Sequence, residues 1–299
     1  MIEATGSPVE WAVAHRAEVR SAVTAEGWVL VRGLDLTTPE QVGAVAAELG
    51  SLMEEREGHA KRHTYAPGVY SSSVWTDDMP MCMHHELSYA RTFPRLMMFG
   101  CLSLADSGGE VELADARAVL RALRSPMFDD FISNGWQLTR NYHPEAGTPW
   151  EDAFGTTDKN VVEAYCRSNG IHFEWRAGEL LRTSQTHPAV FTHPVTGEEC
   201  WFNQIAFLNE WTMLEDIRDY LVGEFGRDGL PFNTTHADGR LINAPVIDEL
   251  NAIYEKHATQ VHWQPGDLLV VDNIATSHSR KPFSGNRKVV VAMADPLVR

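Results

Sequence analysis

Short apolar runs bounded by turn-forming residues make up most of the chain after its N-terminal region. These runs are too short for helices, and Gly, Pro, Asn or Asp residues separate them, as is typical of strands. Many short strands with turns between them favour a sandwich or barrel over a parallel sheet that alternates with helices. The clearest runs are Arg95–Leu104, Glu110–Ala114, Gly135–Arg140, Glu199–Asn203, Leu268–Asp272 and Arg287–Ala294.

Helices are predicted at the N-terminus and at two insertions. Residues 8–25 carry apolar positions at helical spacing, a strand closed by glycine follows at 27–33, and a second helix is predicted at about 38–50. Within the β-rich part, helical insertions are predicted at 114–134 and 157–168. We therefore expect a mainly β fold with helical decoration.

Length and composition bear on domain number and location. The 299 residues, 43% of them hydrophobic, suffice for one large core, and no repeat or Gly/Ser linker divides them. We therefore expect residues 1–299 to form one domain. No stretch approaches the roughly 18 apolar residues of a membrane span, and the N-terminus lacks the pattern of a signal peptide. These absences predict a cytoplasmic protein with no membrane partner.

Charge and cysteine content argue against three other classes of protein. A formal net charge of −16 repels phosphate backbones, so we expect no nucleic-acid partner. The four cysteines lie far apart and form no Cys-x-x-Cys pair, which argues against a zinc knuckle and a disulfide scaffold.

The first chemically informative motif is Met-His-His-Glu-Leu-Ser-Tyr at 83–89, which places His84 and Glu86 two positions apart. On a strand, residues i and i+2 point to the same face, so these two side chains are able to reach one ion together. His85 would point to the opposite face and is predicted to be a bystander. Short His-x-Glu patterns often arise by chance, so a metal site also requires a further ligand.

The further ligand is expected after the buried strand at 268–272. A turn follows this strand, His278 comes next, and a second turn leads into a returning strand that begins at Arg287. Two histidines and one carboxylate leave three positions open on an ion, which is the ligand set of non-haem Fe(II) oxygenases. Zinc usually takes four ligands in closed sites, so this set suits zinc less well.

Arg287 indicates a co-substrate. A guanidinium matches a carboxylate bidentately and lysine does so less well, so Arg287 is predicted to bind the distal carboxylate of 2-oxoglutarate. The 2-oxo acid end would then chelate Fe(II) and leave one position for O2.

Several motifs occur in the order of a known family. They are His-x-Glu at 84–86, Gly-Gly-Glu at 108–110 and His-x-Arg-x-Pro-Phe-x-Gly-x-Arg at 278–287. Through them the chain resembles the taurine dioxygenase (TauD/TfdA-like) Fe(II)/2-oxoglutarate oxygenases. It looks most like members from nonribosomal-peptide pathways, through Leu-Arg-Thr at 181–183, His-Pro-Val-Thr-Gly-Glu at 193–198 and Trp-Phe-Asn-Gln at 201–204. The resemblance implies a double-stranded β-helix, or jelly-roll, core.

The resemblance also implies a reaction, namely hydroxylation of an unactivated C–H bond in a small amino acid or amino-acid-derived substrate of secondary metabolism. Family members that transfer halogen have a small residue where this chain has Glu86, so hydroxylation is the expected outcome. One departure is Val111, which stands where the family usually has a Thr whose hydroxyl helps to hold the co-substrate. We therefore predict weaker 2-oxoglutarate binding or a replacement donor.

Substrate contacts are predicted from position. Arg280, two residues beyond His278, would bind a substrate carboxylate or form an ion pair near the metal, and Asn203 would line the site or cap a strand end. A lid is expected at Ser71–Met81.

A carrier protein is a further predicted partner. Arg117, Arg121 and Arg124 fall at i, i+4 and i+7 of a predicted helix and form a basic stripe on an acidic protein. The stripe is either an ordinary solvated face or a docking site for an acidic carrier that presents a tethered amino acid.

Three alternative functions remain. With the same cofactors the outcome would be desaturation, cyclisation or another oxidative rearrangement. A non-catalytic metal-binding jelly roll would sense a small ligand. A zinc hydrolase is disfavoured because no His-Glu-x-x-His motif is present.

Overall fold

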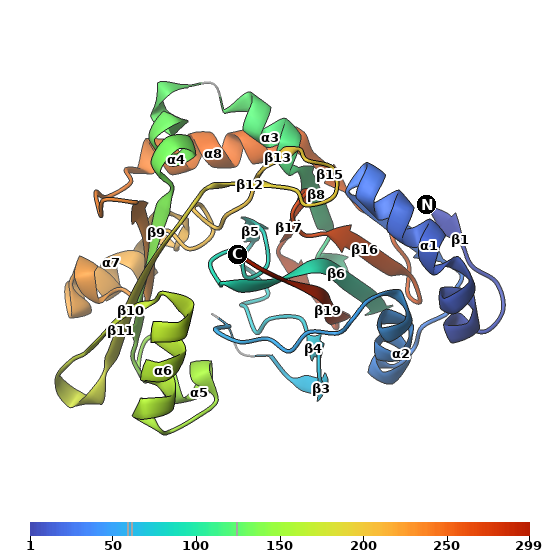
Figure 1. The fold of residues 1–299 in the computed structure, drawn as a ribbon, viewed down its shortest axis with the longest axis horizontal. Coiled ribbons are helices and arrows are strands. Elements are labelled where there is room, and N and C mark those ends of the chain that lie inside the picture. The colour runs from blue at the N-terminus through green and yellow to red at the C-terminus, as the bar shows by residue number, and fades with distance from the viewer. Residues whose placement is uncertain (59, 61, 124) are drawn as a thin grey trace.

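The computed structural model describes residues 1–58, 60, 62–123 and 125–299. Two antiparallel sheets pack on a shared apolar core, and β1 alone joins its neighbour in parallel (Figure 1). The larger sheet has the order β1 (Ile2–Glu3), β2 (Trp28–Arg32), β16 (Leu268–Asp272), β6 (Thr92–Ser103), β19 (Lys288–Val298), β4 (Val69–Ser71) and β3 (Thr64–Ala66). The smaller sheet has the order β15 (Ala258–Gln260), β8 (Val111–Asp115), β17 (Thr276–Arg280) and β5 (Met81–His84).

Strands in the middle of the larger sheet are buried on both faces. In β16, Leu269 and Val271 point into the core shared with the smaller sheet, whereas Leu268 and Val270 point into a second core. Helices α1 (Pro8–Glu26) and α2 (Pro39–Leu49) cover this second core. Because successive side chains of a strand face opposite sides, burial on both faces explains why the apolar runs are nearly continuous.

A third sheet lies on the side of the molecule away from α1 and α2 (Figure 1). Its order is β10 (His172–Trp175), β11 (Leu181–His187), β9 (Trp136–Tyr142) and β14 (Phe232–His236). Helices α5 (Trp150–Phe154) and α6 (Lys159–Asn169) pack on it through a small core of their own. Two further strand pairs are β12 (Val190–Thr192) with β13 (Glu199–Trp201), and β7 (Ser107–Gly108) with β18 (Phe283–Ser284).

The predicted β-rich fold with helical decoration is confirmed, but several elements differ. The insertion at 114–134 is not one helix. It comprises α3 (Ala116–Ala122), a 3₁₀ turn at Pro126–Phe128 and α4 (Asp129–Asn134). Proline cannot continue a helix, because it has no N–H, and the Ser125 hydroxyl instead caps the 3₁₀ turn.

Some elements were not predicted from the sequence. The sequence of β17, Thr-Ser-His-Ser-Arg, contains no apolar residue, so its pattern did not indicate a strand. Helices α7 (Glu215–Phe225) and α8 (Ala244–His257) were also missed, and further 3₁₀ turns lie at Ala177–Glu179, Glu210–Thr212 and Arg227–Gly229. Within the described residues, no helix combines the length and the apolar character needed to cross a membrane.

Candidate metal centre

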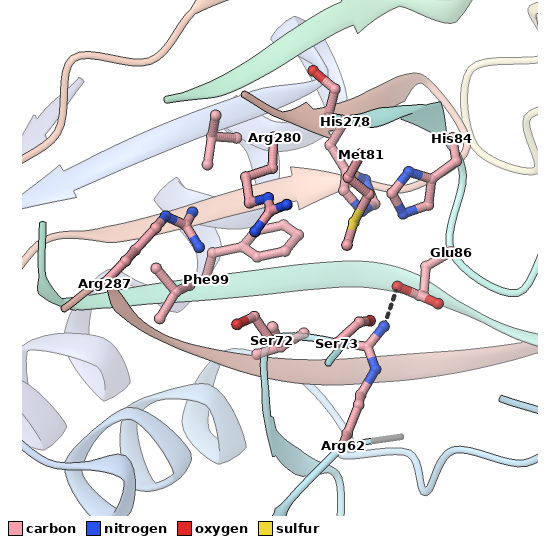
Figure 2. A pocket seen from close by; sticks show the side chains of 14 residues that line it. Arg62, Ser72, Ser73, Met81, His84, Glu86, Phe99, His278, Arg280 and Arg287 are labelled. Atoms are coloured by element: carbon pink, nitrogen blue, oxygen red, sulfur yellow. Dashed lines mark hydrogen bonds and ion pairs between the residues drawn. The ribbon is translucent and has the colours of Figure 1, made fainter. Parts of the chain in front are cut away.

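Three side chains that are able to bind a metal ion meet at the edge of the smaller sheet. His84 is the last residue of β5, His278 lies within β17, and the two are cross-strand partners. Glu86 follows β5 in a turn. One candidate ligand atom from each residue lies within 4.8 Å of the other two, and all three residues are buried (Figure 2). The structure therefore brings the predicted triad together.

The predicted reason for this proximity was wrong. The strand ends at His84, so Glu86 does not share a strand face with it. Glu86 instead lies in a turn that Asn273 holds, since the Asn273 side chain accepts from the Glu86 N–H at 2.8 Å and donates to the Glu86 carbonyl at 2.9 Å. Leu87 completes the turn with a φ of 53°. A side chain from the 268–278 segment thus positions the carboxylate.

The polar atoms of the triad are arranged for ligation. The Nδ1 atom of His84 lies 2.8 Å from the Cys82 carbonyl, so Nδ1 carries the proton and Nε2 keeps its lone pair. Burial lowers the pKa of His84 and of His278, which keeps both rings neutral. Oε2 of Glu86 accepts from Arg62 at 2.7 Å, whereas its Oε1 is buried and has no hydrogen-bond partner among the described residues.

His85 lies outside the triad, as predicted. Its Nδ1 atom lies 2.6 Å from the Asn273 carbonyl, and its ring packs against Phe202. Burial lowers the pKa of His85 to about 4, so this histidine is a neutral core residue.

A pocket extends from the triad to Arg287. Figure 2 shows the triad at one end of this pocket and Arg287 at the other, with Phe99 and Arg280 between them. Arg287 immediately precedes β19 of the larger sheet, so it does not lie on a strand next to β17, as the sequence had suggested. The pocket therefore lies between the two sheets.

Arg287 is a guanidinium without a carboxylate partner among the described residues. Its Nε donates to the Gly109 carbonyl at 3.0 Å, and burial lowers its pKa to about 10. A Cβ atom at Gly109 would lie 2.9 Å from Cδ of Arg287, so only glycine leaves room for this side chain. The remaining N–H groups are available to an anion.

Arg280 contacts the predicted lid. Its Nη2 donates to the carbonyls of Thr76 at 2.9 Å and Met79 at 2.7 Å, so it fixes the segment between β4 and β5. Ser72 and Ser73 of that segment line the pocket together with Met81, the first residue of β5, which agrees with the predicted position of a lid.

Two other predicted residues have local partners. Asn203 donates to the Ala189 carbonyl at 3.0 Å and accepts from the Ile205 N–H at 3.1 Å, so it stabilises a turn and is not part of the pocket wall. Val111 does line the pocket, and its side chain offers no hydroxyl there.

The basic stripe differs from its prediction. The helix that was to carry it ends at Ala122, and Arg117 is paired with Asp115 and Glu198, each at 2.9 Å. Arg121 is exposed, and Arg124 lies outside the described residues.

Sequence reasoning missed Arg62. Besides its bond to Glu86, it lies 3.3 Å from a carboxylate oxygen of Glu55, and its side chain is only 5% exposed. Arg62 lies in an irregular segment with no motif, so only its burial beside two carboxylates identifies it.

Comparison with known proteins places this geometry in context. The family model described as "Taurine catabolism dioxygenase TauD, TfdA family" matches residues 4–293. The chain is 32% identical over 276 residues to the dapdiamide synthesis protein DdaC of Enterobacter agglomerans, covering 92% of this chain and 84% of that protein. It is 25% identical over 284 residues to a clavaminate synthase-like protein of Arabidopsis thaliana, covering 91% and 83%.

Solved structures share the fold. A putative alpha-ketoglutarate-dependent taurine dioxygenase from Burkholderia xenovorans aligns with a TM-score of 0.54 at 16% identity, covering 99% of this chain and 91% of that one. PvcB, an Fe, alpha-ketoglutarate dependent oxygenase from an isonitrile synthetic pathway, aligns with a TM-score of 0.52 at 13% identity, covering 95% and 82%. This likeness confirms the predicted jelly-roll core.

Proposed function

Because the chain belongs to the TauD, TfdA family of iron- and 2-oxoglutarate-dependent dioxygenases, we propose that it hydroxylates a C–H bond in an amino-acid-derived small molecule. His84, Glu86 and His278 hold the iron in this proposal, and Arg287 holds the co-substrate. The observation that carries it is the buried triad, whose ligand atoms lie within 4.8 Å of one another. The triad shares a pocket with Arg287, which has no carboxylate partner among the described residues.

The triad suits a ferrous ion for two reasons, namely its set of donor atoms and the lack of another partner for Oε1 of Glu86. Two neutral imidazoles and one carboxylate suit non-haem Fe(II), and they leave coordination positions open. A buried carboxylate oxygen without a hydrogen bond is costly, and none of the described residues donates one to Oε1 of Glu86. A metal ion beside both histidines satisfies it.

Arg287 fits the distal carboxylate of 2-oxoglutarate. A guanidinium that is buried without an anion is unfavourable, and the lowered pKa of Arg287 expresses that cost. A bound carboxylate would accept from its free N–H groups and remove the cost. The pocket runs from Arg287 to the triad, so an extended dicarboxylate would reach from one to the other (Figure 2).

Iron, 2-oxoglutarate and O2 together supply an oxidant strong enough to attack an unactivated C–H bond. The chain's own residues position the reactants and exclude water. The Cys82 carbonyl fixes the His84 ring, and Arg62 holds one oxygen of Glu86, so the open side of the site faces the pocket. Arg280 holds the segment at 72–80 over that pocket through its two carbonyl contacts.

Hydroxylation is the proposed outcome because Glu86 fills the position that a halide would need. Desaturation, cyclisation and oxidative rearrangement use the same cofactors and differ only in where the substrate carbon lies. The product's mass separates these outcomes, since hydroxylation adds one oxygen atom and desaturation removes a pair of hydrogens.

The substrate class rests on the relatives. DdaC is a dapdiamide synthesis protein and PvcB belongs to an isonitrile pathway, which supports natural-product biosynthesis. Docking of an acidic carrier at Arg117, Arg121 and Arg124 stays a prediction, and the ion pairs of Arg117 weaken it.

Anaerobic titration of the metal-free protein with Fe(II) and then 2-oxoglutarate tests the proposal. We expect the weak visible absorption band of the iron–2-oxoglutarate chelate in the wild type and none in His84→Ala. His85→Ala is the matched control and should retain the band, because that ring points elsewhere. A band that persists in His84→Ala would overturn the ligand assignment, and a chelate without succinate release on any substrate would favour a non-catalytic ligand sensor.

A further inference from the structure

An apolar groove lies directly behind the candidate metal centre. The segment at 74–82 forms one side of it, and residues at 207–221 with Pro231 and Phe232 form the other. The groove encloses about 300 Å³, which is within the usual range for small-molecule sites. None of the described residues that line it carries a charge, although the chain as a whole is strongly acidic.

The groove lies next to the metal pocket, with Phe207 between them. This ring stacks on His84 with centroids 4.5 Å apart and contacts Trp75 at 5.4 Å. Phe207 and Trp75 both line the groove, whereas His84 lines the pocket. A single layer of aromatic rings therefore separates the groove from a candidate ligand of the iron.

The rim of the groove is apolar and uncovered. Val74 is 71% exposed, Leu214 is 50% exposed and Ile217 is 45% exposed. Helix α7, which contributes Ile217 and Leu221, has no fully buried residue. Contiguous apolar surface of this kind marks a binding site, since a ligand that covers it removes it from water.

One polar atom in the groove wall lacks a partner. The indole N–H of Trp75 is buried and has no hydrogen-bond acceptor among the described residues. Buried N–H groups are normally paired, so this donor suits a carbonyl oxygen of a ligand that is otherwise apolar.

A second hollow, which shares Arg62 with the metal pocket, has a lining of the opposite chemistry. Glu55, Arg56, Arg62 and Asp152 line it. A charged substrate group would find partners there, whereas in the apolar groove it would lose its hydration without compensation. The two hollows therefore select different side chains.

We propose that the apolar groove binds an uncharged aliphatic or aromatic side chain of the substrate, while the carbon to be oxidised lies at the metal pocket. This inference rests on the proposed function and narrows its substrate class. It makes Trp75, Phe207 and the groove-facing side of α7 the groups that select the side chain of the substrate.

Calorimetry on the anaerobic protein loaded with Fe(II) and 2-oxoglutarate tests the inference. The neutral probes are N-acetyl-L-leucine amide and N-acetyl-L-phenylalanine amide, and N-acetyl-L-lysine amide and N-acetyl-L-aspartic acid amide are the charged ones. We expect the neutral probes to bind at least about tenfold more tightly than the charged ones.

A pair of variants locates the binding. Ile217→Lys places an ammonium at the rim and should weaken the neutral probes about tenfold, whereas Tyr220→Lys adds the same charge to the same helix outside the groove. Tyr220 is 66% exposed, so this control should leave affinity within about twofold. Both positions are at the surface, and matched unfolding temperatures would show that neither change disrupts the fold.

The outcomes separate this inference from the proposed function. Tighter binding of charged probes, no binding of either neutral probe, or equal effects of the two lysine variants would each overturn the groove assignment. The visible band of the iron chelate is read in the same samples. Absence of that band in the wild type counts against the proposed function. If the band is present and Ile217→Lys does not weaken probe binding, only the groove assignment fails.

Discussion

The metal pocket has two walls that differ in how their groups are partnered. On the charged wall, Arg62 contacts Glu86 at 2.7 Å and Glu55 at 3.3 Å, with little of any of these side chains exposed. On the apolar wall, Phe207 packs on both His84 and Trp75, and the surface beyond them is open. The charged groups are thus paired with one another, apart from Oε1 of Glu86, whereas the apolar wall is open.

The difference shows what each wall is able to do. Buried charges need partners at defined positions, so the charged wall fixes one oxygen of Glu86 and leaves the other for a metal. Apolar contacts are non-directional, so the apolar wall tolerates ligands of different shape. The charged wall sets the geometry of the centre, and the apolar wall is suited to selecting what lies beside it.

The third sheet anchors the charged wall. Arg140 of β9 donates to the carbonyls of Glu57 at 2.7 Å and Gly58 at 3.0 Å, and the Tyr89 hydroxyl donates to the Glu57 carbonyl at 2.8 Å. These bonds hold the chain on the N-terminal side of Arg62.

The largest effect is expected from Glu86→Ala, which removes a proposed ligand and leaves Arg62 buried beside a single carboxylate. We expect Fe(II) affinity to fall about 100-fold or more, because even residues behind a ligand typically contribute 10- to 100-fold. Loss of the ion pair should also lower the free energy of unfolding by about 3–5 kcal/mol. Metal titration and urea unfolding of the metal-free protein measure the two effects separately.

The double variant Glu86→Ala/Arg62→Met sharpens this test. Methionine fills much of the arginine's volume without its charge, so stability should partly recover while metal binding stays lost. Arg56→Met is the matched control, because Arg56 is exposed. Recovery of metal binding in the double variant would show that Glu86 is not a ligand.

Phe207→Leu disrupts the apolar wall and should have a smaller effect of a different kind. Loss of a buried ring that stacks on His84 and contacts Trp75 is expected to cost about 1–3 kcal/mol of unfolding free energy. Fe(II) affinity should change by less than about threefold, because the Cys82 carbonyl still orients His84.

Phe202→Leu controls for a general loss of core packing, since Phe202 is fully buried and contacts His85. Both variants are compared by thermal unfolding and metal titration. If Phe207→Leu alone lowers Fe(II) affinity tenfold or more, the stacked ring and not the hydrogen bond orients His84, and the apolar wall also sets the metal geometry.

Glu57→Gln tests the anchor of the charged wall through pH. Burial raises the pKa of Glu57 above its usual 4.5, against the opposing hydrogen bond from Tyr165. The folded protein therefore binds more protons than the unfolded chain above pH 4.5, and stability is lost as pH rises through the folded pKa. Glutamine does not ionise, so the variant should show a smaller decline.

Urea midpoints of the metal-free protein from about pH 5 to about pH 8 measure this decline. Glu54→Gln is the control, because Glu54 is an exposed neighbour. An equal decline in the wild type and in Glu57→Gln would show that Glu57 is ionised in the folded protein throughout this range.

The sequence predicted the residue types of the site better than their geometry. The sequence indicated the types and order of four candidate site residues, because few residue types are able to bind iron or a carboxylate. These residues are His84, Glu86, His278 and Arg287. The sequence did not indicate their geometry, because Asn273 rather than a strand positions Glu86. The sequence suggested a β-rich fold through its apolar runs, but polar β17 carried no such signal.

The remaining residues of both walls act through tertiary contacts. Arg62 and Phe207 come from segments far apart in the chain, and neither belongs to a periodic pattern or motif. Arg280 was considered as a substrate contact, but its direction depends on where the Thr76 and Met79 carbonyls lie in the folded chain. Such residues are identified only when the positions of their segments in the folded chain are known.

Val111→Thr should give the smallest effect, since it adds one hydroxyl to an apolar stretch of the pocket near Arg287. Val111 is 4% exposed, and valine and threonine have nearly the same shape, so the fold should tolerate the change. One added hydrogen bond to a carboxylate is worth about 0.5–1.5 kcal/mol, or roughly two- to tenfold in the Kd of 2-oxoglutarate. Titration of the iron-loaded protein measures it, with Val289→Thr as a control on the opposite sheet of the same pocket. Equal affinities in the wild type and Val111→Thr would mean that another donor already serves the carboxylate, and Ser72 and Ser73 in the pocket wall are then the residues to replace.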